Sequence, residues 1–149
     1  MAVKAVSWAE EQLHDHFPGR PVMPAPLIIE GMAQTAGIMV GHARDFEERV
    51  ILAKIKTADF QRDVRPGDTL IYTAVADRID DVGAMTSGTV EVIDGASLTA
   101  DLAAAQRQLV GHIDLIFSHL DQAARDLGLP EHNFVFTEQF MSLLRNSGF

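Results

Sequence analysis

The sequence reads His-Phe-Pro-Gly-Arg-Pro-Val-Met-Pro at residues 16–24 and Leu-Ile-Ile-Glu-Gly-Met-Ala-Gln at residues 27–34. These segments place an imidazole, His16, fourteen positions before a carboxylate, Glu30, across a connection stiffened by prolines. Glu30 is the only charged residue between positions 26 and 41, so a helix there would be buried nearly all round. Because burying a carboxylate is costly, we interpret Glu30 as a functional residue.

The composition excludes several classes of protein. Its 149 residues, 47% of them hydrophobic, predict one domain over 1–149, with a core of 1–120 and an extension of 121–149. The absence of cysteine excludes disulfides, a thiolate nucleophile and cysteine-ligated metal sites. A net charge of −9 argues against nonspecific binding to nucleic acid or anionic membranes. With neither a signal-peptide pattern nor an apolar stretch of roughly 18 residues, we expect no membrane span and a cytoplasmic location.

The pattern of hydrophobic residues predicts one long helix and about five strands. Pro26 suits the first helical position, and the helix is expected to run to about Arg44. Segments expected to be strands are 2–8, 50–55, 58–62, 69–79, 83–93 and 109–118. An antiparallel meander is the simplest connection of the segments between 50 and 93. Residues 96–108 fit no single element, and short helices are expected at 121–127 and 137–144.

A helix without a polar face has to be enclosed on every side, and a mostly antiparallel sheet that wraps around it would do so. The order of the expected elements therefore predicts an α+β hotdog fold.

The sequence also resembles a known family, the FabZ-type 3-hydroxyacyl-acyl-carrier-protein dehydratases. The two segments at 16–24 and 27–34 look like the active-site segment of that family. Residues 2–7 resemble the strand before the family's histidine, and residues 58–68 resemble its Phe-Lys/Arg and Pro-Gly-Asp stretch. Residues 2–95 can be matched in order.

The resemblance implies the reversible dehydration of a (3R)-hydroxyacyl thioester to the trans-2-enoyl thioester, a step of fatty-acid or related lipid biosynthesis. An ordinary imidazole, with a pKa of about 6.5, can accept the proton next to the thioester carbonyl, so His16 is the expected base. Burial of Glu30 would favour its protonated form, which can donate a proton to the departing hydroxide.

Other residues take their expected roles from the same resemblance. The backbone N–H of Ala25, at the helix start, would stabilise the enolate-like oxygen. The family has glycine there, so alanine is compatible only with a negative φ. Residues expected to contact the substrate are Pro24, Gln34, Gly37 and Phe60. Gln34 could orient Glu30 or a water, although an amide satisfied by backbone groups is an equally good interpretation.

The resemblance further implies a partner and an assembly. Acyl carrier protein, bearing a phosphopantetheine-linked substrate, would dock on a basic patch formed by Lys54, Lys56, Arg62 and Arg65; a scattered, solvated charge pattern is the alternative. The base of one subunit would face the acid of its partner in a homodimer, and hexamers occur in the family. We expect no cofactor. We also expect no metal, because the segment His14-Asp15-His16, whose alternate residues would share a face of a strand, has no third ligand at an evident spacing.

Two departures concern the ends of the chain. The family's usual opening helix and first strand have no counterpart, which could leave an exposed sheet edge. The tail from Asp121 to Phe149 could cover it by docking Phe134, Phe136, Phe140 and Leu143; a partner subunit or a different start codon are the alternatives. Two other functions stay open as well, a hotdog acyl-thioesterase and a noncatalytic acyl-binding or assembly subunit.

Overall fold

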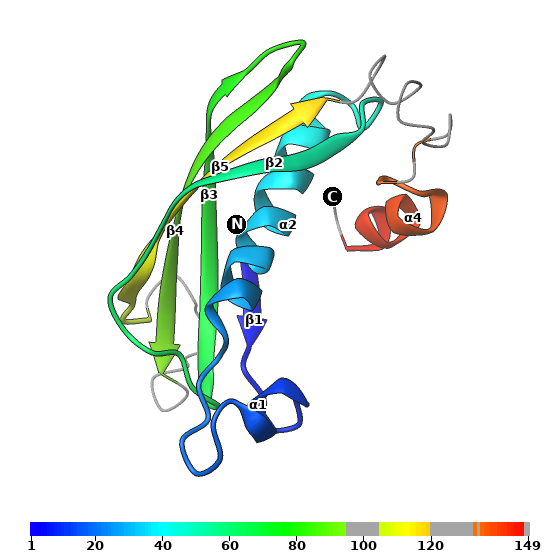
Figure 1. Ribbon diagram of the computed structural model, residues 1–149. Helices are drawn as coiled ribbons and strands as arrows, with labels where there is room; N and C mark the ends of the chain where they lie inside the picture. Colours follow the sequence, from blue (N-terminus) through cyan, green and yellow to red (C-terminus); the bar gives the residue numbers. More distant parts are fainter. Residues whose placement is uncertain (95–104, 120–132, 134, 148–149) are drawn as a thin grey trace.

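The computed structural model describes residues 1–94, 105–119, 133 and 135–147, and its sheet curls around one long helix (Figure 1). The elements are β1 (Ala2–Ala5), α1 (Gln12–Asp15), α2 (Ala25–Ala43), β2 (Val50–Phe60), β3 (Asp68–Ile79), β4 (Gly83–Asp94), β5 (Gln108–His119) and α4 (Glu138–Asn146). Phe134, the helix expected at 121–127 and most of the ambiguous segment 96–108 lie outside the described residues. No helix in the described part is both long and apolar enough to cross a bilayer.

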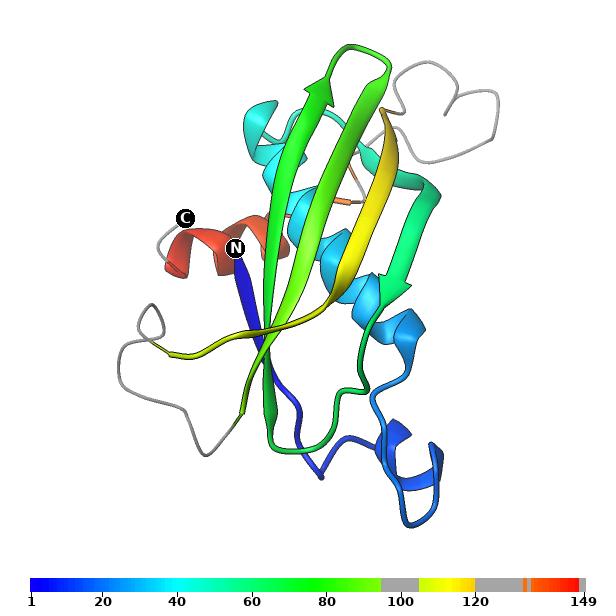
Figure 2. The same cartoon turned by 90° about the vertical axis from the view of Figure 1, so that its left-hand side faces the viewer.

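Within the described residues, the sheet has five antiparallel strands in the order β1-β3-β4-β5-β2, and Figure 2 shows its longer strands running across one side of α2. The meander predicted for the segments at 50–93 is correct for β3 and β4, which pair with each other. It is wrong for β2, which pairs with β5 and lies at the edge of the sheet opposite to β1. The strands that precede and follow α2 in sequence are therefore at the two edges of the curved sheet.

Strand β2 is continuous, whereas the sequence suggested two separate strands at 50–55 and 58–62. Its register against β5 shifts between Leu52 and Lys54 and again between Ile55 and Thr57. A bulge of this kind disturbs the inside–outside alternation without ending the strand. The irregular pattern around Lys56 therefore marks a bulge.

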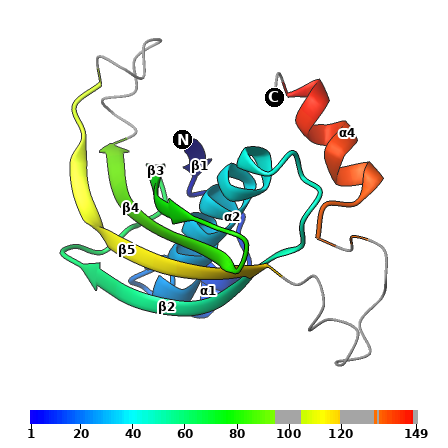
Figure 3. The same cartoon turned by 90° about the horizontal axis from the view of Figure 1, so that it is seen from above.

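Helix α2 runs within one residue of its predicted bounds, but its predicted burial on all sides is wrong for the single chain. Its buried face includes Ile28, Met32, Ala36 and Val40, whereas Leu27, Glu30 and Gln34 are exposed. The sheet reaches only one side of the helix, as Figure 3 shows from above. The short helix α1, immediately before His16, was not predicted because four residues give no helical period.

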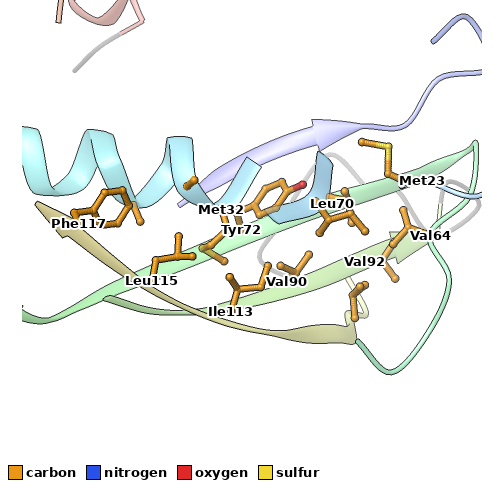
Figure 4. Packing of buried hydrophobic residues seen from close by; sticks show 14 of the residues in the cluster. Met23, Met32, Val64, Leu70, Tyr72, Val90, Val92, Ile113, Leu115 and Phe117 are labelled. Carbon is orange, nitrogen blue, oxygen red and sulfur yellow. The ribbon is translucent and has the colours of Figure 1, made fainter. Parts of the chain in front are cut away.

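The core lies between α2 and the sheet. Strand residues such as Leu70, Val90 and Ile113 pack beneath Met32 of the helix (Figure 4). Tyr72 is also fully buried there, and its ring meets the helix at Gly31, where a Cβ atom would lie 2.5 Å from the phenol. The helix can approach β3 this closely because Gly31 has no side chain.

The C-terminal segment, which we define as residue 133 together with residues 135–147, packs against the C-terminal half of α2. Phe136 is buried against Gly41 and Phe46. Helix α4 lies on the side of α2 away from the sheet (Figure 1), and it is capped by Thr137, whose Oγ1 accepts a hydrogen bond from the backbone N–H of Phe140. The described part of this segment adds no strand to the sheet beside β1, so it covers the helix and not that edge.

We predict that Gly31→Ala lowers the free energy of unfolding by about 1–3 kcal/mol, because the new methyl group would overlap the buried Tyr72 ring. Gly37→Ala is the matched control. A Cβ atom there meets only Phe117, at 3.7 Å, so the better helix propensity of alanine should raise the free energy of unfolding by up to about 1 kcal/mol. Urea unfolding measures both, and equal effects would contradict the close packing at Gly31.

Burial, with a smaller contribution from the charge of Glu10, raises the pKa of Tyr72 from 10.0 to about 12. The folded protein therefore holds this proton more tightly than the unfolded chain. Its contribution to stability is complete below pH 10 and should be lost as the pH rises through about 12. Tyr72 is the only tyrosine, so an absorbance titration of phenolate reports on it alone. A native midpoint near 10 would contradict this prediction, and Tyr72→Phe should abolish the step.

Candidate active site

His16 lies at the start of a tight loop whose backbone holds the imidazole in place. The Nδ1 atom of His16 is 2.8 Å from the carbonyl oxygen of Val22, and the N–H of Val22 donates back to the carbonyl of His16 at 2.8 Å. The N–H of Met23 donates to the carbonyl of Val64, which ties the loop to the segment before β3. The ring of Phe17 stacks on the imidazole with a centroid distance of 4.2 Å.

The contact between Nδ1 of His16 and the carbonyl oxygen of Val22 decides which nitrogen of the imidazole carries the proton in the neutral state. A carbonyl oxygen can only accept, so Nδ1 must donate to Val22. The lone pair of the neutral ring is then on Nε2. The half-buried His16 therefore offers Nε2 as a proton acceptor in a fixed orientation.

His16 lines a cavity of about 420 Å³ between its loop, the start of α2 and the end of β2. Of the residues predicted from the sequence, Ala25, Phe60 and Arg62 also line it. Asp45 and Phe46 are the non-glycine residues with positive φ in the described part of the chain, so Ala25 has the negative φ that alanine requires. As the first residue of α2, Ala25 has an N–H without an acceptor inside the helix.

Glu30 lies on the exposed face of α2, which corrects the prediction that it is buried. The predicted burial assumed that one chain encloses the helix, but the sheet covers only its opposite face. The Nε2 atom of Gln34 donates to Oε1 of Glu30 at 2.8 Å. Both side chains line a second cavity, of about 310 Å³, together with the predicted residue Gly37.

The single chain thus separates the predicted site into two parts. The cavity that contains His16 and the cavity that contains Glu30 have no lining residue in common. Pro24, the remaining predicted contact residue, caps α2 and lines neither cavity. Each cavity holds one of the two groups that the predicted chemistry needs.

The four basic residues predicted as a docking patch are not a compact cluster. Lys54 and Lys56 are exposed in the middle of β2. Lys54 is about 20 Å from the end of this strand at Phe60, at about 3.3 Å per residue, and Arg62 follows that end. Arg62 donates to Gln108 at 2.6 Å and lies 3.4 Å from Asp68. The exposed Arg65 pairs with Asp63 at 3.6 Å.

Sequence reasoning missed Arg20 as a lining residue of the His16 cavity. Its guanidinium pairs with Asp63 at 2.9 Å. Its position inside the segment 16–24 was the available signal.

In the described part of the chain, no group of three His, Asp or Glu side chains could hold a metal ion. The Nε2 atom of His14 lies 3.2 Å from the carbonyl oxygen of Trp8.

Comparison with known proteins decides the family. Residues 1–101 match the family model of the FabA-like domain. The chain belongs to the FabA-like family. This match includes β1, the His16 loop, α2 and β2 to β4 of the FabA-like chain.

Curated relatives carry the name 3-hydroxyacyl-acyl-carrier-protein dehydratase FabZ. The protein from Verminephrobacter eiseniae is 37% identical over 112 residues, which cover 72% of this chain and 75% of the relative. That from Fusobacterium nucleatum is 48% identical over 77 residues, 51% of this chain and 53% of the relative. The FabA-like chain spans only about half the length of two of these relatives, 53% of the one from Fusobacterium nucleatum and 51% of the one from Petrotoga mobilis.

Solved structures confirm the hotdog fold of this FabA-like chain. An acyl-CoA hydrolase from Staphylococcus aureus superposes with a TM-score of 0.62 at 18% identity, over 82% of this chain and 65% of the other. The hexameric thioesterase y2039 from Yersinia pestis gives 0.62 at 14% identity, over 89% and 92%. At these identities the likeness extends to the fold alone.

Proposed function

We propose that this chain, as a single hotdog domain, catalyses the reversible dehydration of (3R)-hydroxyacyl thioesters to trans-2-enoyl thioesters in lipid biosynthesis in the cytoplasm. One observation carries the proposal. The imidazole of His16 is oriented by the Val22 carbonyl in the same cavity as the helix start at Ala25. A base beside an anion-stabilising N–H is what removal of a proton next to a thioester carbonyl requires. The FabZ names of the relatives support the same reaction.

Each group has one step in the proposed reaction. Nε2 of His16 takes a proton from C2, and the N–H of Ala25 donates to the thioester oxygen as negative charge develops there. The C3–O bond then breaks while Glu30 donates a proton to the departing hydroxide, which leaves as water. Transfer of a proton from the imidazolium to the carboxylate, through solvent, restores both groups.

A second copy of the chain would bring the two groups together. His16 and Glu30 line separate cavities in one chain, and Glu30 lies on the face of α2 that the sheet does not cover. Strand β2 forms one edge of the sheet, next to β5 within the described residues. A homodimer related by a two-fold axis could cover this edge and this face at once, and so enclose Glu30 beside the partner's base. Dimers of this kind could assemble further into hexamers.

Acyl carrier protein is the proposed carrier of the substrate. With a net charge of −9, the chain can attract an acidic carrier only through local positive charge. Arg62 lines the His16 cavity, and Arg65 is exposed nearby in sequence. Lys54 and Lys56, exposed on the edge strand β2, could extend this surface in a dimer.

The direct test is hydration of 2-enoyl thioesters, linked to acyl carrier protein or to coenzyme A, followed by the loss of ultraviolet absorbance of the conjugated enoyl group. We expect the wild type to hydrate them. His16→Ala and Glu30→Gln should each lower kcat by about 100-fold or more, because general acid–base groups contribute that much. His14→Ala, which alters a neighbouring exposed histidine, is the control and should keep its activity.

Two other outcomes would favour the alternatives. Release of free thiol without hydration would identify a thioesterase. Binding of the acyl carrier protein without turnover of any chain length would identify an acyl-binding subunit.

A mixing experiment tests the shared site. Dimers of His16→Ala and dimers of Glu30→Gln should be inactive alone, yet each mixed dimer would contain one intact pair of groups. Subunit exchange should therefore restore roughly a quarter of the wild-type activity, since half of the dimers are mixed and each has one working site. Recovery of no activity, with exchange verified by mass spectrometry, would mean that both groups act within one chain.

A further inference from the structure

The C-terminal segment takes no part in the proposed chemistry, yet it forms one end of the cavity that contains Glu30. We propose that Phe136 and Phe140 close this cavity at its far end and so limit the length of the acyl chain that the enzyme accepts. The inference rests on the proposed function, because it assigns the acyl chain to the Glu30 cavity.

The lining of the cavity changes from polar to apolar along α2. Glu30 and Gln34, which are hydrogen-bonded to each other, supply its polar side chains. The remaining lining residues are apolar, and they come from α2, β2, β5 and the C-terminal segment. A thioester whose reacting carbons lie beside Glu30 would therefore extend its hydrocarbon chain away from Glu30, past Gly37.

Phe136 lies where such a chain would have to end. Its ring packs on Gly41, where a Cβ atom would be 2.5 Å from Cζ of Phe136. Gly41 follows Glu30 by eleven residues, which is about 16 Å along the helix at about 1.5 Å per residue. The cavity, about 310 Å³, is at the lower end of the range of ~300–1,000 Å³ typical of ligand pockets.

Several contacts hold the two aromatic rings in position. Phe136 is only 8% exposed and meets the ring of Phe46 edge-on, with a centroid distance of 5.1 Å. The Nδ2 atom of Asn133 donates to the carbonyl of Phe46 at 3.2 Å, and its Oδ1 accepts from the backbone N–H of Phe136 at 3.0 Å. Phe140 follows one turn later, 6.0 Å from Phe136 between ring centroids. The closed end is therefore an anchored wall.

The test compares kcat/KM for hydration of a short substrate, crotonyl thioester, with that for a long one, hexadecenoyl thioester. Phe140→Ala should raise the long-to-short ratio by about tenfold or more, because it removes part of the wall. Gly37→Leu should lower the ratio, since the position lines the cavity and a Cβ atom there is in ordinary contact with Phe117, at 3.7 Å. Leu143→Ala is the matched control, because Leu143 is on the same helix but 65% exposed and does not line the cavity.

The two substitutions act in opposite directions, so a general loss of stability cannot imitate the result. If folded, active Phe140→Ala and Gly37→Leu both keep the wild-type ratio, the inference is overturned and the dehydratase function stands. If the wild type hydrates nothing, calorimetry with short- and long-chain S-alkyl pantetheine thioethers measures the long-to-short ratio of binding affinities. A shift there supports the wall although the proposed reaction fails, and an unchanged ratio overturns the wall as well.

Discussion

The structure depends on glycines at points where helix α2 comes very close to other elements. Gly31 allows Tyr72 of β3 to reach the helix backbone, and Gly41 allows Phe136 to do the same at the other end. On the sheet side, a Cβ atom on Gly88 of β4 would lie 2.5 Å from the sulfur of Met32. Close packing of this kind leaves no free volume for a larger side chain. The position of α2, and with it the positions of Ala25 and Glu30, follows from these contacts.

Much of the fold could be predicted from the sequence because its strongest signals are local. The apolar run that contains Glu30 gave α2 within one residue at each end, and the alternating segments gave β3, β4 and β5. The place of β2 at the edge beyond β5 could not be predicted, because strand order depends on long-range pairing that leaves no periodic signal. For the same reason, the bulge within β2 looked like a break between two strands.

The residues of the candidate site could be predicted from the sequence, but their arrangement in space could not. The resemblance to the FabZ-type dehydratases implied roles for His16 and Ala25, which the structure brings to one cavity. The burial of Glu30 was inferred from the apolar composition of the helix, and that inference assumed enclosure by one chain. The apolar surface around Leu27 and Glu30 is uncovered in the single chain. The apolar composition of α2 indicates that this face of the helix has to be covered, but it does not identify the molecule that covers it.

The hydrogen bond between His16 and Val22 has a consequence for how activity would depend on concentration. Both residues belong to one short loop, so each separate chain already has its imidazole oriented. Among the described residues, the carboxylate of Glu30 accepts a hydrogen bond from Gln34, and it is exposed in the single chain. In the proposed arrangement, association creates the complete catalytic unit, so specific activity would fall when the protein is diluted below the dissociation constant of its dimer.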